Sequence, residues 1–184
     1  MNEQEIVNLI KSDTWMLTVL NEAESTHLPD WMIGAGFLRN KVWDHLHGIK
    51  REVADTNDID LIYYDASNQN EGSDKALSKQ MSGKLGLEWE IVNQAYSHKW
   101  HNREIPYNNS TEALAEWIET PTCVAVTLEN GVPKIIAPHG IDDLVNLIVR
   151  PIPTADINTF NRRYQSKRWL EKWPKLKIVM SDLE

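Results

Sequence analysis

Asp58-Ile59-Asp60-Leu61-Ile62-Tyr63-Tyr64 is rich in β-branched and aromatic residues, a composition that predicts a strand. Side chains two positions apart on a strand point to the same face, so Asp58 and Asp60 project together with Cα atoms roughly 6.5–7 Å apart. Carboxylates so placed can share hard divalent cations such as Mg²⁺. Two metals about 3.5–4 Å apart would neutralise a triphosphate and hold both the attacking and the leaving oxygen. The pair therefore indicates phosphoryl-transfer chemistry.

A second acidic strand is predicted at residues 87–93. Leu87, Trp89 and Ile91 occupy one face of it, while Glu88 and Glu90 occupy the other together with Val92. The chain holds 27 Asp and Glu residues, so such acidic pairs also arise by chance. A solvated strand face is the alternative interpretation for both strands.

Upstream of both strands, a short apolar run at residues 31–33 ends at Gly34-Ala35-Gly36, and a helix is predicted from Phe37. A glycine turn that opens a helix presents backbone N–H groups to an anion. Arg39 follows within the first turns, and its planar fork can reach a phosphate. A plain tight turn is the alternative.

The remaining patterns complete an α+β fold: a small mixed β-sheet with packed helices. We expect a single domain over residues 1–184, in which 110–184 can form a C-terminal lobe of helices and a hairpin. Asn130-Gly131 is a strong hairpin signal, because both residues tolerate positive φ. Helices are predicted at 3–25 (split at Ser12-Asp13), 37–46, 75–85, 110–117, 142–149 and 156–173, and strands at 122–128, 132–137 and 176–180.

Composition narrows the function classes. With 19 Lys and Arg against 27 Asp and Glu, the net charge is −8, which argues against a protein whose main task is to grip nucleic-acid backbone. No run approaches the roughly 20 apolar residues of a membrane span, and the acidic N-terminus lacks the order of a signal peptide. Cys123 is the one cysteine and cannot form an internal disulfide, so we expect a cytoplasmic protein.

Several motifs together resemble a bacterial nucleotidyltransferase family of unassigned substrate, itself similar to the DNA polymerase β-like nucleotidyltransferase superfamily. The resemblance covers residues 31–179. It is carried by Gly34-Ala35-Gly36-Phe37-Leu38-Arg39-Asn40-Lys41-Val42-Trp43-Asp44, Asp58-Ile59-Asp60-Leu61, Trp89-Glu90-Ile91-Val92-Asn93-Gln94-Ala95, Pro106-Tyr107, Trp117, Ala137-Pro138-His139-Gly140-Ile141-Asp142-Asp143-Leu144, Arg150-Pro151 and Lys172-Trp173-Pro174.

The resemblance implies a mixed-sheet core with a glycine turn for the nucleotide phosphates. Asp58 and Asp60 correspond to the two metal-binding acids of the superfamily, and Glu90 corresponds best to its third acid. The expected activity is Mg²⁺-dependent transfer of a nucleoside monophosphate from an NTP to an unknown acceptor, with release of pyrophosphate. Two Mg²⁺ ions, bound by these three acids, are expected.

In this hypothesis Gly34, Gly36 and Arg39 hold the phosphates, and Glu90 also helps to deprotonate the acceptor hydroxyl. Asn93 can contact the nucleotide, or it can tie down a turn through its backbone bonds. The rival hypotheses are a non-catalytic nucleotide-binding protein on the same scaffold and a plain protein-interaction domain. The last would be favoured if packed side chains covered the glycine turn.

Three further features have two interpretations each. A basic C-terminal stretch is ordinarily a solvated helix face, but it can attract a triphosphate or a polyanionic acceptor; it comprises Arg162, Arg163, Lys167, Arg168, Lys172 and Lys175. Cys123 fits buried packing better than a nucleophile. The histidine pairs His45/His47 and His98/His101 suggest zinc, but they lack a recognisable ligand spacing.

Overall fold

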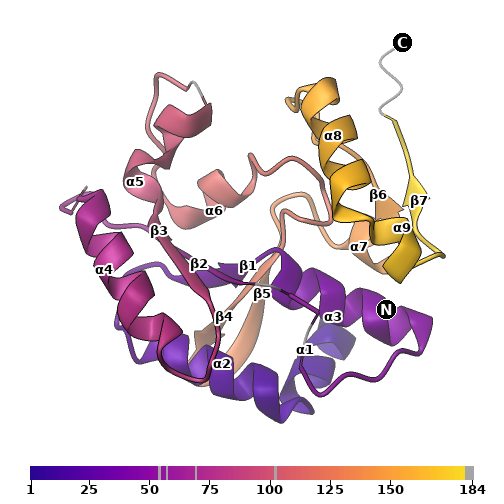
Figure 1. Cartoon of the computed structure of the whole chain (residues 1–184), viewed down its shortest axis with the longest axis horizontal. Coiled ribbons are helices and arrows are strands. Elements are labelled where there is room, and N and C mark those ends of the chain that lie inside the picture. Colours follow the sequence, from indigo (N-terminus) through magenta and orange to yellow (C-terminus); the bar gives the residue numbers. More distant parts are fainter. Residues whose placement is uncertain (54, 57, 69, 102, 181–184) are drawn as a thin grey trace.

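The computed structural model describes residues 1–53, 55, 56, 58–68, 70–101 and 103–180, with the His101 backbone but not its side chain. Helices and strands alternate irregularly along the chain (Figure 1). The helices are α1 (Glu3–Lys11), α2 (Thr14–Glu24), α3 (Gly36–His47), α4 (Glu71–Ser82), α5 (Gln94–Ser97), α6 (Ser110–Leu114), α7 (Asp142–Val145), α8 (Ile157–Lys167) and α9 (Trp169–Lys172), with a 3₁₀ turn η1 (His98–His101). The strands are β1 (Met32–Gly34), β2 (Ile59–Tyr63), β3 (Trp89–Asn93), β4 (Ala125–Glu129), β5 (Val132–Ile136), β6 (Ile148–Val149) and β7 (Lys177–Ile178).

Five strands form one mixed sheet in the order β3-β2-β1-β4-β5. β2 and β3 are parallel, whereas β1 pairs antiparallel with both β2 and β4. The parallel pair is possible because α4 connects its two strands as a crossover. β6 and β7 pair in parallel as a separate two-stranded sheet. The predicted fold class, a small mixed sheet with packed helices, is confirmed.

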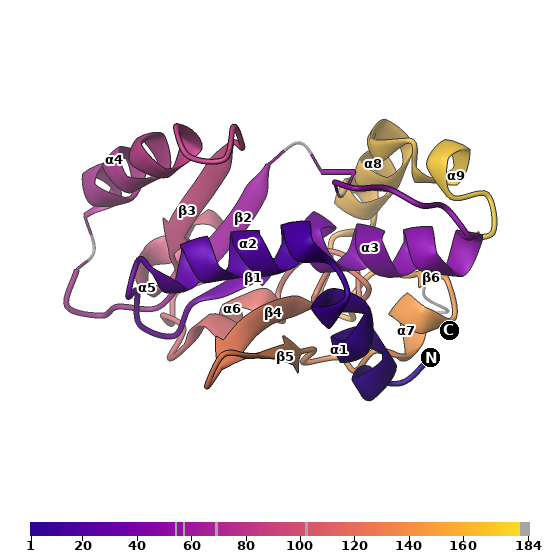
Figure 2. The ribbon, with the colours of Figure 1, turned by 90° about the horizontal axis from the view of Figure 1, so that it is seen from below.

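The main core lies on the face of the sheet that α1 and α2 cover, and Figure 2 shows α2 lying across β1 on this side. Ile33, Leu61 and Val126 point to this face from three adjacent strands, and all are fully buried. The helices contribute Ile6, Ile10, Met16, Val19, Leu20 and Ala23. Burial of this one face leaves the opposite face of β2 and β3 available for polar side chains.

Local signals explain where several elements begin and end. The helix predicted at 3–25 is split as expected, since Asp13 caps α2 by accepting a hydrogen bond from the Met16 N–H (2.9 Å). The predicted hairpin is present, with positive φ at Asn130 (53°) and Gly131 (74°). Asn109 caps α6 as predicted, although α6 ends at Leu114 rather than near Trp117.

Two helix predictions in the C-terminal half are wrong in extent. The segment 142–149 forms only the single turn α7, because Leu147 adopts positive φ (60°) and the chain then enters β6. The segment 156–173 is interrupted at Arg168, which also has positive φ (53°) and ends α8 before α9 begins. Both predicted helices are broken at a non-glycine residue with positive φ, a conformation that such residues rarely adopt, so the sequence does not reveal these helix breaks.

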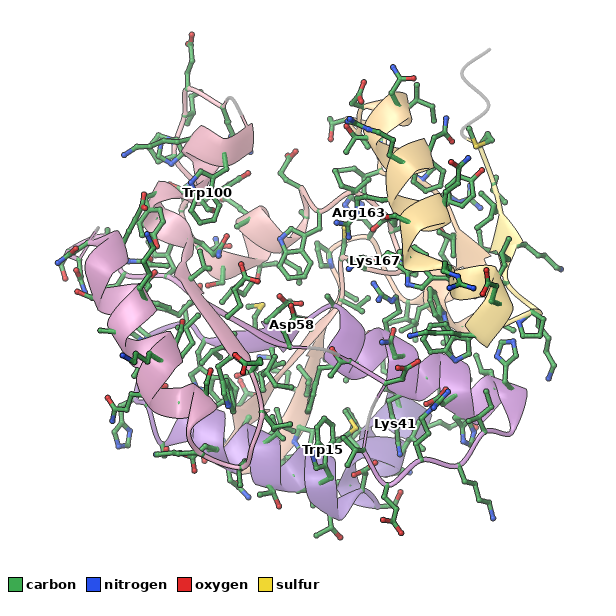
Figure 3. The ribbon with its side chains drawn as sticks, viewed as in Figure 1. Trp15, Lys41, Asp58, Trp100, Arg163 and Lys167 are labelled. Atoms are coloured by element: carbon green, nitrogen blue, oxygen red, sulfur yellow. The ribbon has the colours of Figure 1, made fainter. Side chains whose placement is uncertain are left out.

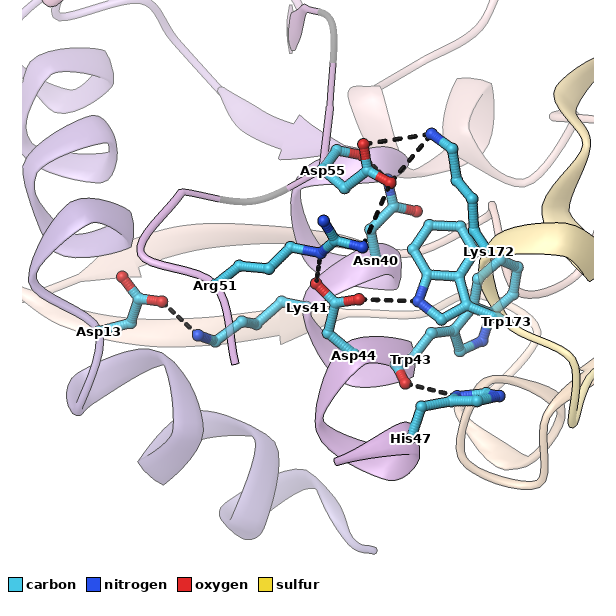
Figure 4. Close-up of polar contacts among 10 residues, drawn as sticks. All are labelled: Asp13, Asn40, Lys41, Trp43, Asp44, His47, Arg51, Asp55, Lys172 and Trp173. Atoms are coloured by element: carbon cyan, nitrogen blue, oxygen red, sulfur yellow. Dashed lines mark hydrogen bonds and ion pairs between the residues drawn. The ribbon is translucent and has the colours of Figure 1, made fainter. Parts of the chain in front are cut away.

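Polar contacts fix the C-terminal segment against α3 and the loop after it (Figure 4). The indole N–H of Trp173 donates to Asp44 Oδ1 (2.8 Å), and both residues are buried. Arg51 donates to the other oxygen of Asp44 (3.0 Å), and Lys172 pairs with Asp55 (2.9 Å). These contacts hold α9, and with it the end of α8, beside α3.

In the described part of the chain, we find no helix whose length and apolar character would let it cross a bilayer.

Candidate metal and nucleotide site

Strand periodicity and register together create an acidic cluster on the open face of the sheet. Ile59, Leu61 and Tyr63 turn into the core, so Asp60 turns the opposite way. In the parallel pair β2–β3, Asp60 lies directly beside Glu90. Asp58 precedes β2 and projects to the same side, as predicted. The expectation that Glu90 faces the aspartates from the neighbouring strand is confirmed.

Carboxylate oxygens of Asp58, Asp60 and Glu90 lie within 4.8 Å of one another. The pKa of Asp60 is raised to about 7 by burial and by the charges of Asp58 and Glu90, in that order. Arg39 and Lys167 act in the opposite direction, but the net shift is upward. Three converging oxygen ligands with uncompensated negative charge fit a hard divalent cation such as Mg²⁺.

The glycine turn serves two different purposes at its two glycines. A Cβ at Gly34 would lie 2.6 Å from Cη2 of Trp117, so Gly34 makes room for that indole and is covered by it. A Cβ at Gly36 would lie 3.0 Å from Oγ1 of Thr56, a hydroxyl that donates to the Asp58 carbonyl (2.7 Å). Gly36 therefore lets the segment that carries Asp58 approach α3.

The turn remains open at Ala35 and Gly36, which line a cavity of about 220 Å³ together with Asp58 and Asp60. Ala35 holds positive φ (48°), a strained conformation that aims the start of α3 at this cavity. No side chain caps the first turn of α3 in the described structure. Its N–H groups are thus available to an anion. Gly34, which Trp117 covers, is absent from the described lining of this cavity, and its contact with phosphate stays a prediction.

Arg39 supplies a fixed positive charge to the same cavity. It is only 6% exposed, and its guanidinium stacks on Trp169 (4.5 Å from Cζ to the ring centroid) and on Trp43 (5.1 Å). It donates to two neutral groups, Thr122 Oγ1 (2.7 Å) and Asn40 Oδ1 (3.1 Å). Burial, partly offset by Glu119, lowers its pKa to about 10. Arg39 therefore stays charged near neutral pH, and its positive charge faces the cavity.

A basic wall formed by Arg163, Lys167 and Lys172 faces the acidic cluster from α8 and α9. Arg163 and Lys167 also border a neighbouring cavity of about 340 Å³ that contains all three acids. Figure 3 shows these two side chains across the open face from Asp58. The structure supports the second interpretation of the C-terminal basic stretch for these three residues. Sequence alone could not identify them, because their proximity depends on the break at Arg168 and the contacts of Figure 4.

Arg163 is positioned by Glu119, whose carboxylate is fully buried. Nε of Arg163 donates to Oε1 of Glu119 (2.8 Å), whereas Oε2 of Glu119 has no hydrogen-bond partner among the described residues. Pairing with Arg163 is thus the main compensation for a buried charge. Glu119 was not among the predicted site residues, and no motif near it signals this role.

Asn93 has the structural role that was considered as the alternative. Its fully buried amide donates to the Asp65 carbonyl (2.8 Å) and to the Asn68 carbonyl, and its Oδ1 accepts from the N–H groups of Asp65 (3.0 Å) and Ala95 (3.1 Å). All these partners are backbone groups. Asn93 is absent from the described lining of the cavities around the acids. These bonds support the turn-holding interpretation, whereas contact between Asn93 and a nucleotide stays a prediction.

We expect Asn93→Ala to lower the free energy of unfolding by about 2–3 kcal/mol, because it removes several hydrogen bonds to buried backbone groups. The affinity for nucleotide should stay the same within twofold. Chemical unfolding, together with a nucleotide titration of the folded fraction, would check both. A stable variant with weakened nucleotide binding would restore the original prediction for Asn93.

The other candidate ligands are placed as follows. Cys123 is buried and its thiol donates to the Trp117 carbonyl (3.1 Å), while burial raises its pKa, so the packing interpretation is confirmed. Nδ1 of His47 donates to the Trp43 carbonyl (2.8 Å). The side chain of His101 lies outside the described residues. Within those residues, the acidic cluster is the group that could hold a metal ion.

The chain belongs to the nucleotidyltransferases, since the family model of that description matches residues 21–178. This result agrees with the resemblance found in the sequence. Among curated proteins, none matches the chain.

Solved structures share the fold. A protein whose NMR structure "reveals a CCA-adding enzyme head domain" is 27% identical, with a TM-score of 0.85 over 98% of this chain and 97% of that one. A CCA-adding enzyme in complex with CTP is 14% identical, with a TM-score of 0.59 over 97% of this chain. The Thermotoga maritima CCA-adding enzyme in complex with tRNA is 14% identical, with a TM-score of 0.57 over 98% of this chain. This chain spans 43% of the length of each of the latter two.

Proposed function

We propose that the protein transfers a nucleoside monophosphate from an NTP to the hydroxyl of an acceptor and releases pyrophosphate. The observation that carries the proposal is the juxtaposition, around one cavity, of Asp58 and Asp60 with the cations Arg39, Arg163 and Lys167. An acidic cluster alone would repel a triphosphate. Divalent cations and a basic wall on the same cavity reverse that repulsion.

Asp58, Asp60 and Glu90 would hold two Mg²⁺ ions, which, when bound, neutralise the charge that develops on the transferred phosphoryl group and on the leaving oxygen. The raised pKa of Asp60 means that metal and proton compete for it. Asp60 and Glu90 come from two adjacent strands of a packed sheet, and Asp58 directly precedes the first of these strands, so the sheet brings the three acids together before any ligand arrives.

The β- and γ-phosphates would lie between the start of α3 and the basic wall. Backbone N–H groups at Gly36 and beyond, with Arg39, would contact them from one side. Arg163 and Lys167 would contact them from α8. The same cations would then stabilise pyrophosphate as the leaving group.

Glu90 would accept the proton of the attacking hydroxyl. It is the most exposed of the three acids, and it lies at the side of the cluster away from α3. A general base must lie within hydrogen-bond reach of the proton that it removes. This position gives an incoming acceptor access to Glu90 without displacing the phosphates.

The first experiment is a titration with each NTP, in Mg²⁺ and in excess EDTA, followed by tryptophan emission. Trp169 and Trp173 border the cavity and would report on binding. CTP and ATP come first, because similar folds have been solved with these nucleotides. We expect saturable binding that depends on Mg²⁺. Binding of equal strength in EDTA, or none, would contradict the proposed site.

Glu88→Gln and Glu90→Gln form a matched pair for this titration. Each removes one negative charge near the start of β3, but only Glu90 belongs to the acidic cluster. We expect Glu90→Gln to weaken the Mg²⁺-dependent response and Glu88→Gln to leave it intact. Equal effects would show that net charge, rather than the cluster, governs binding.

An acceptor screen that measures pyrophosphate release then separates an enzyme from a nucleotide-binding protein. Metal-dependent binding with no release for any hydroxyl acceptor would favour the non-catalytic alternative. We also propose that residues 1–184 act as a single domain, since the C-terminal segment contributes Arg163 and Lys167 to the same cavity as the sheet acids.

A further inference from the structure

We propose that a pocket walled by Trp100 and Trp117 binds the acceptor, and that the part of the acceptor next to the attacking hydroxyl is an uncharged ring. This inference rests on the proposed function and names the acceptor's chemistry at that site. The pocket lies on the far side of the acidic cluster from the basic wall, with a volume of about 110 Å³. It is lined by Asp60, Glu90, Ile62, Val92, Trp100 and Trp117, among others.

The order of elements across the sheet assigns opposite sides to the two substrates. From β1 to β3 the open face presents Gly36 at the start of α3, then Asp60 on β2, then Glu90 on β3. The cavity at the start of α3 includes Asp58 and Asp60, whereas the pocket at Trp100 includes Asp60 and Glu90. Figure 3 shows Trp100 on one side of Asp58, with Arg163 and Lys167 on the other.

In phosphoryl transfer the attacking and leaving oxygens lie roughly in line, on opposite sides of the phosphorus. If pyrophosphate leaves toward the basic wall, the acceptor oxygen must approach from the side of Glu90. The new P–O bond then forms as the bond to pyrophosphate breaks, and the hydroxyl proton passes to Glu90. The pocket at Trp100 is therefore where the rest of the acceptor has to lie.

Charge and shape select the acceptor's chemistry. The described residues that line this pocket include no lysine or arginine, so a phosphate inside it would find no cationic side chain to pair with. Trp100 is a large aromatic residue with 56% of its surface exposed, although apolar side chains are normally buried. The volume is comparable to the roughly 150 Å³ of a cavity that holds one benzene ring. A single neutral ring, stacked on an indole, fits these conditions.

The aromatic wall is held in place before any ligand binds. Tyr96 packs edge-on against Trp100, with ring centroids 5.6 Å apart, and its hydroxyl donates to the buried carboxylate of Asp74 (2.5 Å). Trp117 lies against Gly34, where no side chain keeps it away. An exposed indole that is braced in this way loses little conformational entropy when a ring stacks on it.

The test uses ¹⁵N-tryptophan-labelled protein with Mg²⁺ and a non-hydrolysable NTP analogue, to which cytidine or methyl glucoside is added. These neutral probes carry a hydroxyl on a nucleoside or on a sugar, and the two arms distinguish a base face from a sugar face. We expect at least one probe to shift the Trp100 indole resonance, assigned with Trp100→Phe. Trp100→Ala should lower the affinity for that probe about tenfold. Ile105 is another exposed apolar residue, and Ile105→Ala should leave this affinity unchanged.

The outcomes separate the two proposals. If the analogue binds with Mg²⁺ but neither probe reaches Trp100, or if Trp100→Ala leaves probe affinity unchanged, the acceptor assignment is wrong while the proposed function stands. A different outcome is that the analogue itself shifts the Trp100 indole resonance, with Trp100→Ala lowering the affinity for the analogue. In that case the pocket takes the base of the NTP instead, and the acceptor assignment is also wrong. Failure of the analogue to bind overturns the proposed function.

Discussion

Replacing Asp60 with Asn is expected to stabilise the metal-free protein and to abolish its response to Mg²⁺. The carboxylate is confined with two others, and its pKa is raised to about 7. A raised pKa means that the folded state binds more protons than the unfolded state between about pH 4 and 7, so stability falls as the pH rises through that range. Asn removes this penalty, and we expect the free energy of unfolding at pH 8 to rise by about 1–2 kcal/mol.

The same change should lower the rate of nucleotidyl transfer by about a thousandfold, since metal ions contribute several kcal/mol to the transition state. Urea unfolding with and without Mg²⁺, followed by pyrophosphate release, measures both effects. Glu88→Gln is the control and should change neither. A destabilised Asp60→Asn protein that still responds to Mg²⁺ would show that Asp60 is not a ligand.

Replacing Arg163 with Met should have the largest effect on stability among changes in the basic wall. Met keeps much of the side-chain volume but leaves the fully buried Glu119 carboxylate without its ion-pair partner. Breaking such a pair leaves an uncompensated charge, and we expect a loss of about 2–3 kcal/mol in the free energy of unfolding. Mg²⁺-NTP affinity should fall as well, because a phosphate contact is lost.

The double variant Glu119→Gln/Arg163→Met separates these two consequences. Removing both charges should restore most of the stability, whereas the affinity for NTP should remain low. Urea unfolding and the tryptophan titration provide the two readouts. Recovery of NTP affinity along with stability would mean that Arg163 acts only through the fold.

The sequence was sufficient to predict those structural features that depend on a short stretch of neighbouring residues. Alternation around Asp60 predicted its face, and Asp13 and Asn130-Gly131 marked the helix break and the hairpin that the structure contains. The family resemblance assigned Glu90 to the same group of acids, and the register of β2 with β3 places it beside Asp60. The acidic cluster could therefore be predicted as a unit.

The basic wall and the aromatic pocket could not be predicted, because both depend on contacts between distant segments. Lys167 reaches the acids only because Arg168 adopts positive φ and because Trp173 is anchored on Asp44. Gly34 appeared to be a phosphate contact, yet its missing side chain accommodates Trp117, which is 83 positions later in the chain. A pattern can show that a glycine is needed, but not which neighbour requires the space.

The central claim is that Asp58, Asp60 and Glu90 bind the divalent metal that accompanies the NTP. Crystals grown with Mn²⁺ and a non-hydrolysable NTP analogue test it directly, because Mn²⁺ gives an anomalous signal. We predict anomalous density among these three carboxylates, with the analogue's phosphates between it and the residues Arg39, Arg163 and Lys167. Analogue bound with its Mn²⁺ density away from the three acids would contradict the account.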